Sequence, residues 1–110
     1  MAANQHVYHI ILIKTKPSTT SIQIDEWAAV AKSNVGKIPG LLSSRIGTPQ
    51  APLSTARTKG YEVGVVMIFE SAQALADFGK NPIHELSAKL SKEFAEDRLA
   101  FDFFDMPLSC

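Results

Sequence analysis

The residues from His6 to Thr15 constrain the fold of this chain more than any other stretch. They are almost all apolar or aromatic and rich in isoleucine and valine, without the polar alternation of a strand that has one face in water. No basic segment precedes the run, and it is too short to cross a bilayer, so we expect no membrane contact. The pattern predicts a strand that is covered on both faces.

Apolar spacing along the rest of the chain alternates between the periods of helices and strands. A 3.6-residue period predicts a helix over 21–36, in which Trp27 anchors the buried stripe. Two-residue alternation predicts the other strands, which cover 41–47, 61–69 and 99–104. The order is that of an α+β, ferredoxin-like β-α-β-β-α-β fold, whose antiparallel sheet carries its helices on one face.

The second helix is predicted in two pieces, separated by a break near Asn81. Asn81 is a good N-cap and Pro82 suits the first helical position, so His84 lies in the first turn. The positive end of the helix dipole disfavours imidazolium there, which predicts a neutral His84 that can accept a proton. The alternative is a histidine that only packs. The stripe that this helix is expected to bury consists of Ile83, Leu86, Leu90 and Phe94.

Composition limits the partners and the compartment. Eleven basic and eleven acidic residues give a formal net charge of zero, and no run of Lys and Arg is dense enough to follow a phosphate backbone, so no nucleic-acid partner is expected. Cys110 is the only cysteine, which excludes an intramolecular disulfide and is typical of a cytoplasmic protein. The length predicts a single domain over 6–105, followed by a short tail over 106–110.

Residue types and spacing exclude several kinds of site. His6 and His9 lie on opposite faces of the first strand, and no cysteine or carboxylate is spaced as a co-ligand, so no metal site is expected. The sequence has neither a glycine-rich phosphate loop nor a nucleophile elbow. What remains is acid and base chemistry without a cofactor, in an apolar cavity.

Asp102 lies inside an aromatic segment, between Phe101 and Phe103. A carboxylate in such a strand is either at a solvent-facing edge or buried with a partner, because an unpaired buried charge is costly. A neutral His84 that is oriented by Asp102 would be a general base, and each residue would explain the other. We therefore predict that one ring nitrogen of His84 donates to Asp102 and that the other faces a substrate.

From His9 to Phe103 the chain resembles the stress-responsive A/B barrel family. The segments that carry the resemblance are His9–Lys14, Lys16-Pro17, Ile38-Pro39-Gly40, Gly60-Tyr61, Ile68–Ser71, Asn81–His84 and Phe101–Phe103. Members of this family are dimeric α+β barrels, so the resemblance implies a homodimer. Dimerisation is also the simplest way to cover the apolar sheet face that the helices leave open.

The family contains plant stress proteins and a cofactor-free polyketide cyclase. The resemblance to that cyclase implies that His84 is the catalytic histidine, that Asp102 supports it and that His9 is a pocket histidine. The catalytic tyrosine of the cyclase falls on Phe78, so either Tyr61, Tyr8 or His9 replaces it or the reaction differs. The residues expected to bind the substrate are Tyr8, Ile11, Trp27, Val63, Met67 and Phe78.

These observations favour a cofactor-free cyclase or lyase in which His84 enolises a hydrophobic carbonyl substrate. One alternative is a non-catalytic, dimeric stress or ligand-binding protein, which the absence of a tyrosine at Phe78 favours. A cofactor-independent monooxygenase is a third hypothesis.

Overall fold

The structure, a computed structural model, describes residues 5–51 and 57–105, so the tail predicted over 106–110 lies outside the described residues. The helices and strands are, in order, β1 (Val7–Thr15), α1 (Ser21–Ser33), β2 (Leu41–Gly47), β3 (Tyr61–Phe69), α2 (Ala72–Phe78), α3 (Pro82–Lys92) and β4 (Ala95–Phe104). The strands form one antiparallel sheet in the order β2-β3-β1-β4. The α+β, ferredoxin-like fold predicted from the sequence is confirmed.

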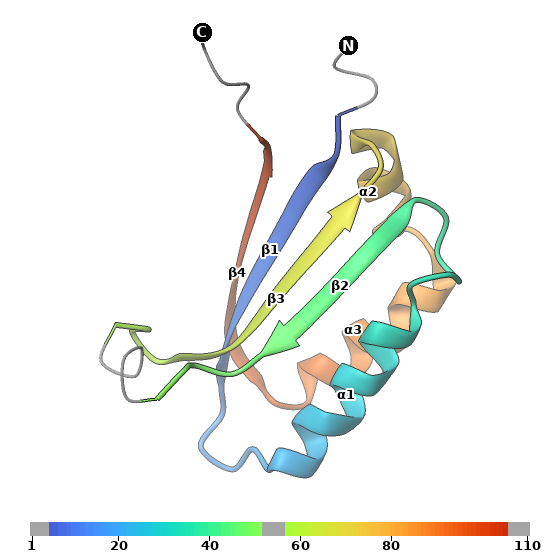
Figure 1. The fold of residues 1–110 in the computed structure, drawn as a ribbon. Coiled ribbons are helices and arrows are strands. Elements are labelled where there is room, and N and C mark those ends of the chain that lie inside the picture. Colours follow the sequence, from blue (N-terminus) through green and yellow to red (C-terminus); the bar gives the residue numbers. More distant parts are fainter. Residues whose placement is uncertain (1–4, 52–56, 106–110) are drawn as a thin grey trace, which may run out of the picture.

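The helices form a layer on one face of the sheet. Figure 1 shows α1 and α3 side by side along this face, with α2 at the end where β3 finishes. The indole of Trp27 meets the ring of Phe94 edge-on, with 5.6 Å between ring centroids, as expected of a core anchor. The buried hydrophobic residues of the core are Val7, Ile13, Trp27, Ala31, Ile38, Leu41, Val63, Val65, Met67, Phe69, Phe78 and Phe94.

β1 lies inside the sheet because it pairs with β3 on one side and with β4 on the other. Its alternate side chains point to opposite faces. Those on the helix side, such as Val7 and Ile13, are buried. In the part of the chain that the structure describes, no helix covers the second face (Figure 1). The sequence predicted that β1 is covered on both faces, and the helices of this chain cover one of them. We call this second face the open face; its apolar residues are Tyr8, Ile10, Leu12, Val66, Ile68, Leu99, Phe101 and Phe103.

The stripe predicted for α3 is wrong for two of its four residues. Ile83 and Leu86 are 41% and 54% exposed, whereas Ser87 and Ser91 face the sheet and are only 5% and 2% exposed. The serines are tolerated there because each hydroxyl donates to a backbone carbonyl one turn earlier, Ser87 to that of His84 and Ser91 to that of Ala88. No unsatisfied hydroxyl is therefore buried at these two positions.

Two element boundaries also differ from the sequence-based prediction. α1 ends at Ser33 rather than at residue 36, because Asn34 caps it and a turn follows. β4 begins at Ala95 rather than at Leu99, since Ala95 already pairs with Thr15 and the backbone N–H of Lys16 donates to the carbonyl of Phe94 at 2.8 Å. Pairing with β1 therefore extends the strand into a polar stretch.

We predict that Gly40→Ala destabilises the fold more than Gly36→Ala. Both glycines have positive φ, 81° and 91°, so alanine carries a backbone penalty of about 1–2 kcal/mol at either position. Only at Gly40 would the added Cβ also collide, at 2.5 Å from the Cβ of Ala74; nothing lies within 4 Å at Gly36. The clash should add about 1–3 kcal/mol to the loss of unfolding free energy, measured by urea denaturation. Equal losses in the two variants would contradict this account of the β2–α2 contact.

Candidate functional site

The N-terminus of α3 positions His84. The side chain of Asn81 accepts a hydrogen bond from the backbone N–H of Ile83 at 2.8 Å, and Pro82 takes the first helical position. The backbone N–H of His84 donates to the carbonyl of Asn81 at 3.0 Å. The cap predicted from the sequence is confirmed, and it fixes His84 in the first turn of the helix.

The ring of His84 is half-buried against Phe78, with 4.0 Å between ring centroids and 43° between ring planes. Burial lowers the pKa of His84 below its usual value of 6.5. The positive charges of His9, when protonated, and of Arg98 lower the pKa further, while Glu85 opposes them. His84 is therefore neutral at neutral pH, as predicted. The main cause is burial, whereas the sequence analysis attributed the neutral state to the helix dipole.

Asp102 is paired with His9. The two residues lie directly opposite each other in the β1–β4 register, and Nδ1 of His9 is joined to Oδ1 of Asp102. Since a carboxylate only accepts, Nδ1 of His9 carries the proton, and its Nε2 is left for another partner.

The prediction of a hydrogen bond between His84 and Asp102 is wrong, because the carboxylate of Asp102 is hydrogen-bonded to His9 instead. Opposite positions on paired strands bring side chains within direct reach, whereas His84 lies on a helix of the other layer. Within the described ranges, His84 has no side-chain hydrogen bond to any residue.

Four rings form a cluster at the end of the sheet next to α2. The ring of Phe78 lies 6.1 Å from that of His9 and 5.0 Å from that of Phe69, in addition to its contact with His84. The two histidines therefore lie against the same phenylalanine, one fixed by a carboxylate and the other kept neutral by burial. We call His9, Phe69, Phe78 and His84 the ring cluster.

A narrow cavity lies between the sheet and the helices, beside the ring cluster. Its volume is about 30 Å³, enough for one or two water molecules, so a larger ligand must displace side chains. Four of the predicted substrate-binding residues line it: Ile11, Trp27, Met67 and Phe78. The rest of the lining is formed by Ile13, Ala31, His84, Ser87, Ala88, Ser91 and Arg98.

A family model described as the Stress responsive A/B Barrel Domain matches residues 7–105. The chain belongs to this family. It is similar in structure to a protein from Arabidopsis thaliana, with a TM-score of 0.83 and 21% identity over 94% of this chain and 99% of that one. It is also similar to the hydroxynitrile lyase from Passiflora edulis, with a TM-score of 0.82 and 21% identity over 97% and 99% of the two chains.

A third similar structure is a dimeric ferredoxin-like protein of unknown function from Jannaschia. The TM-score is 0.77 and the identity 19%, over 89% of this chain and 97% of that one. At these identities the likeness shows the fold. No curated protein sequence gives a significant match to the chain.

The positions that the family resemblance assigns to a site converge in the structure. His9 and His84 belong to the ring cluster, and Asp102 holds His9. The ring of Phe78 contacts both histidines. Sequence reasoning missed Ser87, Ser91 and Arg98 at the cavity, although the spacing 84, 87, 91 is itself one helical stripe.

Tyr61 and Tyr8 lie away from the ring cluster. Tyr61 pairs with Lys14, five residues along β1 from His9 and so about 17 Å away. Its hydroxyl donates to Asp97 at 2.9 Å, and that hydrogen bond raises the pKa of Tyr61. Tyr8 stacks on Phe103 on the open face, with 5.2 Å between ring centroids. The structure therefore places neither tyrosine where it could replace the one missing at Phe78.

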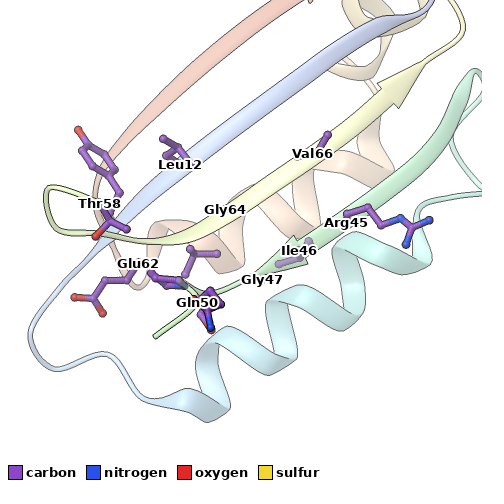
Figure 2. A pocket seen from close by; sticks show the side chains of 13 residues that line it. Leu12, Arg45, Ile46, Gly47, Gln50, Thr58, Glu62, Gly64 and Val66 are labelled. Carbon is purple, nitrogen blue, oxygen red and sulfur yellow. The ribbon is translucent and has the colours of Figure 1, made fainter. Parts of the chain in front are cut away.

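A second hollow, of about 450 Å³, lies at the other end of the sheet (Figure 2). Strand residues Leu12, Arg45, Gly64 and Val66 line it, together with side chains of the segment after β2. Val63, which was expected to bind substrate, reaches this hollow rather than the cavity of the ring cluster. The described residues of this lining include Tyr61 and Glu62 but none of the histidines on which the predicted base depends.

Two further findings concern the described ranges alone. No helix within them is long and apolar enough to cross a membrane. Nor do they contain three metal-ligating side chains grouped around one point.

We predict that the stability of the protein depends on pH through His84. Because the folded pKa lies below 6.5, the unfolded chain binds more protons between these two values. The contribution of His84 to the free energy of unfolding is fully present above the pKa that His84 has in the unfolded chain. It is lost as the pH falls through the pKa of His84 in the folded protein. Urea unfolding between about pH 5 and pH 7 should therefore show a smaller loss of stability on acidification in His84→Gln than in the parent.

His6→Gln is the control for this measurement, since it removes an exposed histidine outside the ring cluster. An NMR titration of the His84 ring should give a midpoint below 6.5. A midpoint at or above that value would contradict the assignment of a neutral, buried ring.

Proposed function

We propose that this protein is a cofactor-free lyase or cyclase that acts on a hydrophobic carbonyl compound, with His84 as the general base. The observation that carries the proposal is a neutral, half-buried imidazole in the wall of a cavity. No described residue occupies a ring nitrogen of His84, so the ring is available to a substrate. A base with a pKa near or below neutrality is in its proton-accepting form at physiological pH.

The similarity to a hydroxynitrile lyase supports lyase chemistry on this fold. In the reaction proposed here, His84 takes a proton from a carbon next to a carbonyl, or from a hydroxyl whose carbon carries a leaving group. In the first case the electron pair forms an enolate, whose carbon attacks a second carbonyl and closes a ring, and the resulting alkoxide takes the proton back from His84. In the second case the electron pair forms a carbonyl, while the leaving group departs with the electrons of its bond and takes the proton from His84.

We assign a supporting role to the His9–Asp102 pair. Asp102 orients the imidazole of His9 through Nδ1, so its Nε2 is positioned by a carboxylate. Positive charge on His9 lowers the pKa of His84, so it favours the neutral form of the base. We therefore assign proton transfer to His84, and we assign to the His9–Asp102 pair an influence on the pKa of His84 from its place against the same phenylalanine, Phe78.

We also propose that the protein is a homodimer that associates through the open face. Leu99 and Phe101 are 50% and 61% exposed there, and Tyr8 and Phe103 stack beside them. Contiguous exposed apolar surface of this kind is typical of an interface. Three of the similar solved structures are described as dimeric, which supports the same assembly.

A non-catalytic, dimeric binding protein is the second candidate. The packing of His84 favours it, because the ring of His84 lies 4.0 Å from that of the buried Phe78. Both candidates require side chains to move before an organic ligand enters the space of about 30 Å³. On this hypothesis His84 only packs against Phe78. The two candidates differ in whether the removal of one imidazole abolishes a reaction.

We predict that His84→Gln lowers turnover at least about 100-fold while the oligomeric state is unchanged, because the variant removes the base and keeps the size of the side chain. The assay uses an aromatic cyanohydrin and a linear poly-β-ketoacyl thioester as probes, with product formation followed by chromatography. Asp102→Asn should lower turnover less, since it removes only the charge that orients His9 and leaves the base in place. His6→Gln should have no effect. Equal turnover in His84→Gln would refute the proposal; binding of a probe without turnover in the parent would favour the second candidate.

We predict that Phe101→Asp dissociates the dimer into monomers. A carboxylate in the centre of an apolar interface has to be desolvated, which should weaken association by at least about tenfold in analytical ultracentrifugation. Ile22→Asp is the matched control, because Ile22 is an exposed apolar residue on α1, away from the open face. If both variants keep the parent's mass, or if Ile22→Asp alone dissociates it, the open face is not the interface.

A further inference from the structure

Arg98 brings a positive charge to the cavity of the ring cluster. It lies opposite Ile13 in the β1–β4 register, and its side chain crosses from β4 to α3, where Nη2 donates to Oγ of Ser91. The hydroxyl of Ser91 in turn donates to the carbonyl of Ala88, so the serine is fixed by two hydrogen bonds. The guanidinium is therefore positioned by a buried residue rather than left to move freely at the surface.

No carboxylate pairs with this guanidinium among residues 5–51 and 57–105. The nearby carboxylate of Asp97 is engaged elsewhere, since it accepts from the hydroxyl of Tyr61 and from the backbone N–H of Arg98 itself. A guanidinium has five N–H donors, and Ser91 takes only one of them. Arg98 is still exposed to water, which keeps the unpaired charge tolerable while leaving donors for an anion.

His84 and Arg98 line the same cavity from its two ends. His84 and Ser91 are seven residues apart on one face of α3, which corresponds to about 10 Å along the helix axis. Between them the lining is largely apolar, with Trp27 and Met67 in contact with the space. The space between them is about 30 Å³, so a ligand that spans both residues has to displace side chains. A ligand that matches this arrangement has an anionic end, an apolar middle and a reactive group near the base.

We propose that Arg98 binds a carboxylate of the substrate, so that hydrophobic keto or hydroxy acids are preferred over neutral ketones or cyanohydrins of the same shape. The assignment of the substrate's reactive group to the end near His84 rests on the proposed function. The preference for a carboxylate rests on Arg98 alone and does not require turnover. Arg98 is thus a residue that determines specificity, at a distance from the proton that is transferred.

The experiment compares the binding of phenylbutanoate and of phenylbutanamide, which have similar shapes and differ in charge. Dissociation constants are measured by NMR titration in the full chain and in four variants. The parent should bind the carboxylate at least about tenfold more tightly than the amide, as expected of a charge-assisted hydrogen bond. Arg98→Gln should abolish this preference, and Arg98→Lys should retain part of it because the charge remains.

Lys89→Gln is the control for loss of charge, since Lys89 is an exposed cation on α3 that does not line the cavity. Circular dichroism and thermal unfolding verify that each variant is folded. The proposal is overturned if the parent binds both probes equally, if it binds neither, or if Arg98→Gln keeps the preference. If the parent prefers the carboxylate but catalyses no reaction, only the proposed function is refuted. His84→Gln should keep the preference for the carboxylate, because it leaves Arg98 unchanged.

Discussion

The register between β1 and β4 is the constraint on which the candidate site depends. It sets His9 opposite Asp102 on the helix side of the sheet, and it sets Arg98 opposite Ile13 on the same side. A shift of one residue would turn the side chains of Arg98 and Asp102 to the open face, away from the cavity and from His9. One strand pairing therefore decides which histidine has a carboxylate partner and where the positive charge enters.

The rotation of α3 supplies the other half of the site. With Ser87 and Ser91 toward the sheet, His84 packs on Phe78, and the small hydroxyl side chains leave room for Arg98 to reach the helix. A rotation that buried Leu86 instead would fill that space with an isobutyl group. The same rotation leaves Leu86 exposed, which costs apolar burial in the helix that carries the proposed base.

In the proposed function, the two faces of the sheet have different roles. The helix side holds the cavity, the ring cluster and Arg98, whereas the open face holds the aromatic surface around Phe101. Because successive side chains of a strand alternate between faces, β4 contributes to both, with Asp102 on one face and Phe103 on the other. Substitutions on one face are therefore expected to separate assembly from chemistry.

The sequence by itself determined the order of the elements, the cap at Asn81 and the place of His84 in the first turn of a helix. These depend on residues that are neighbours along the chain, and the same local pattern carried the family resemblance. The partner of Asp102, the inward face of α3 and the entry of Arg98 were decided only by the tertiary structure. His9 and Asp102 are 93 residues apart, and nothing in either local sequence fixes how two strands align or how a helix turns on a sheet. That choice belongs to the packing of the whole layer, in which side chains from distant segments have to fill one common space.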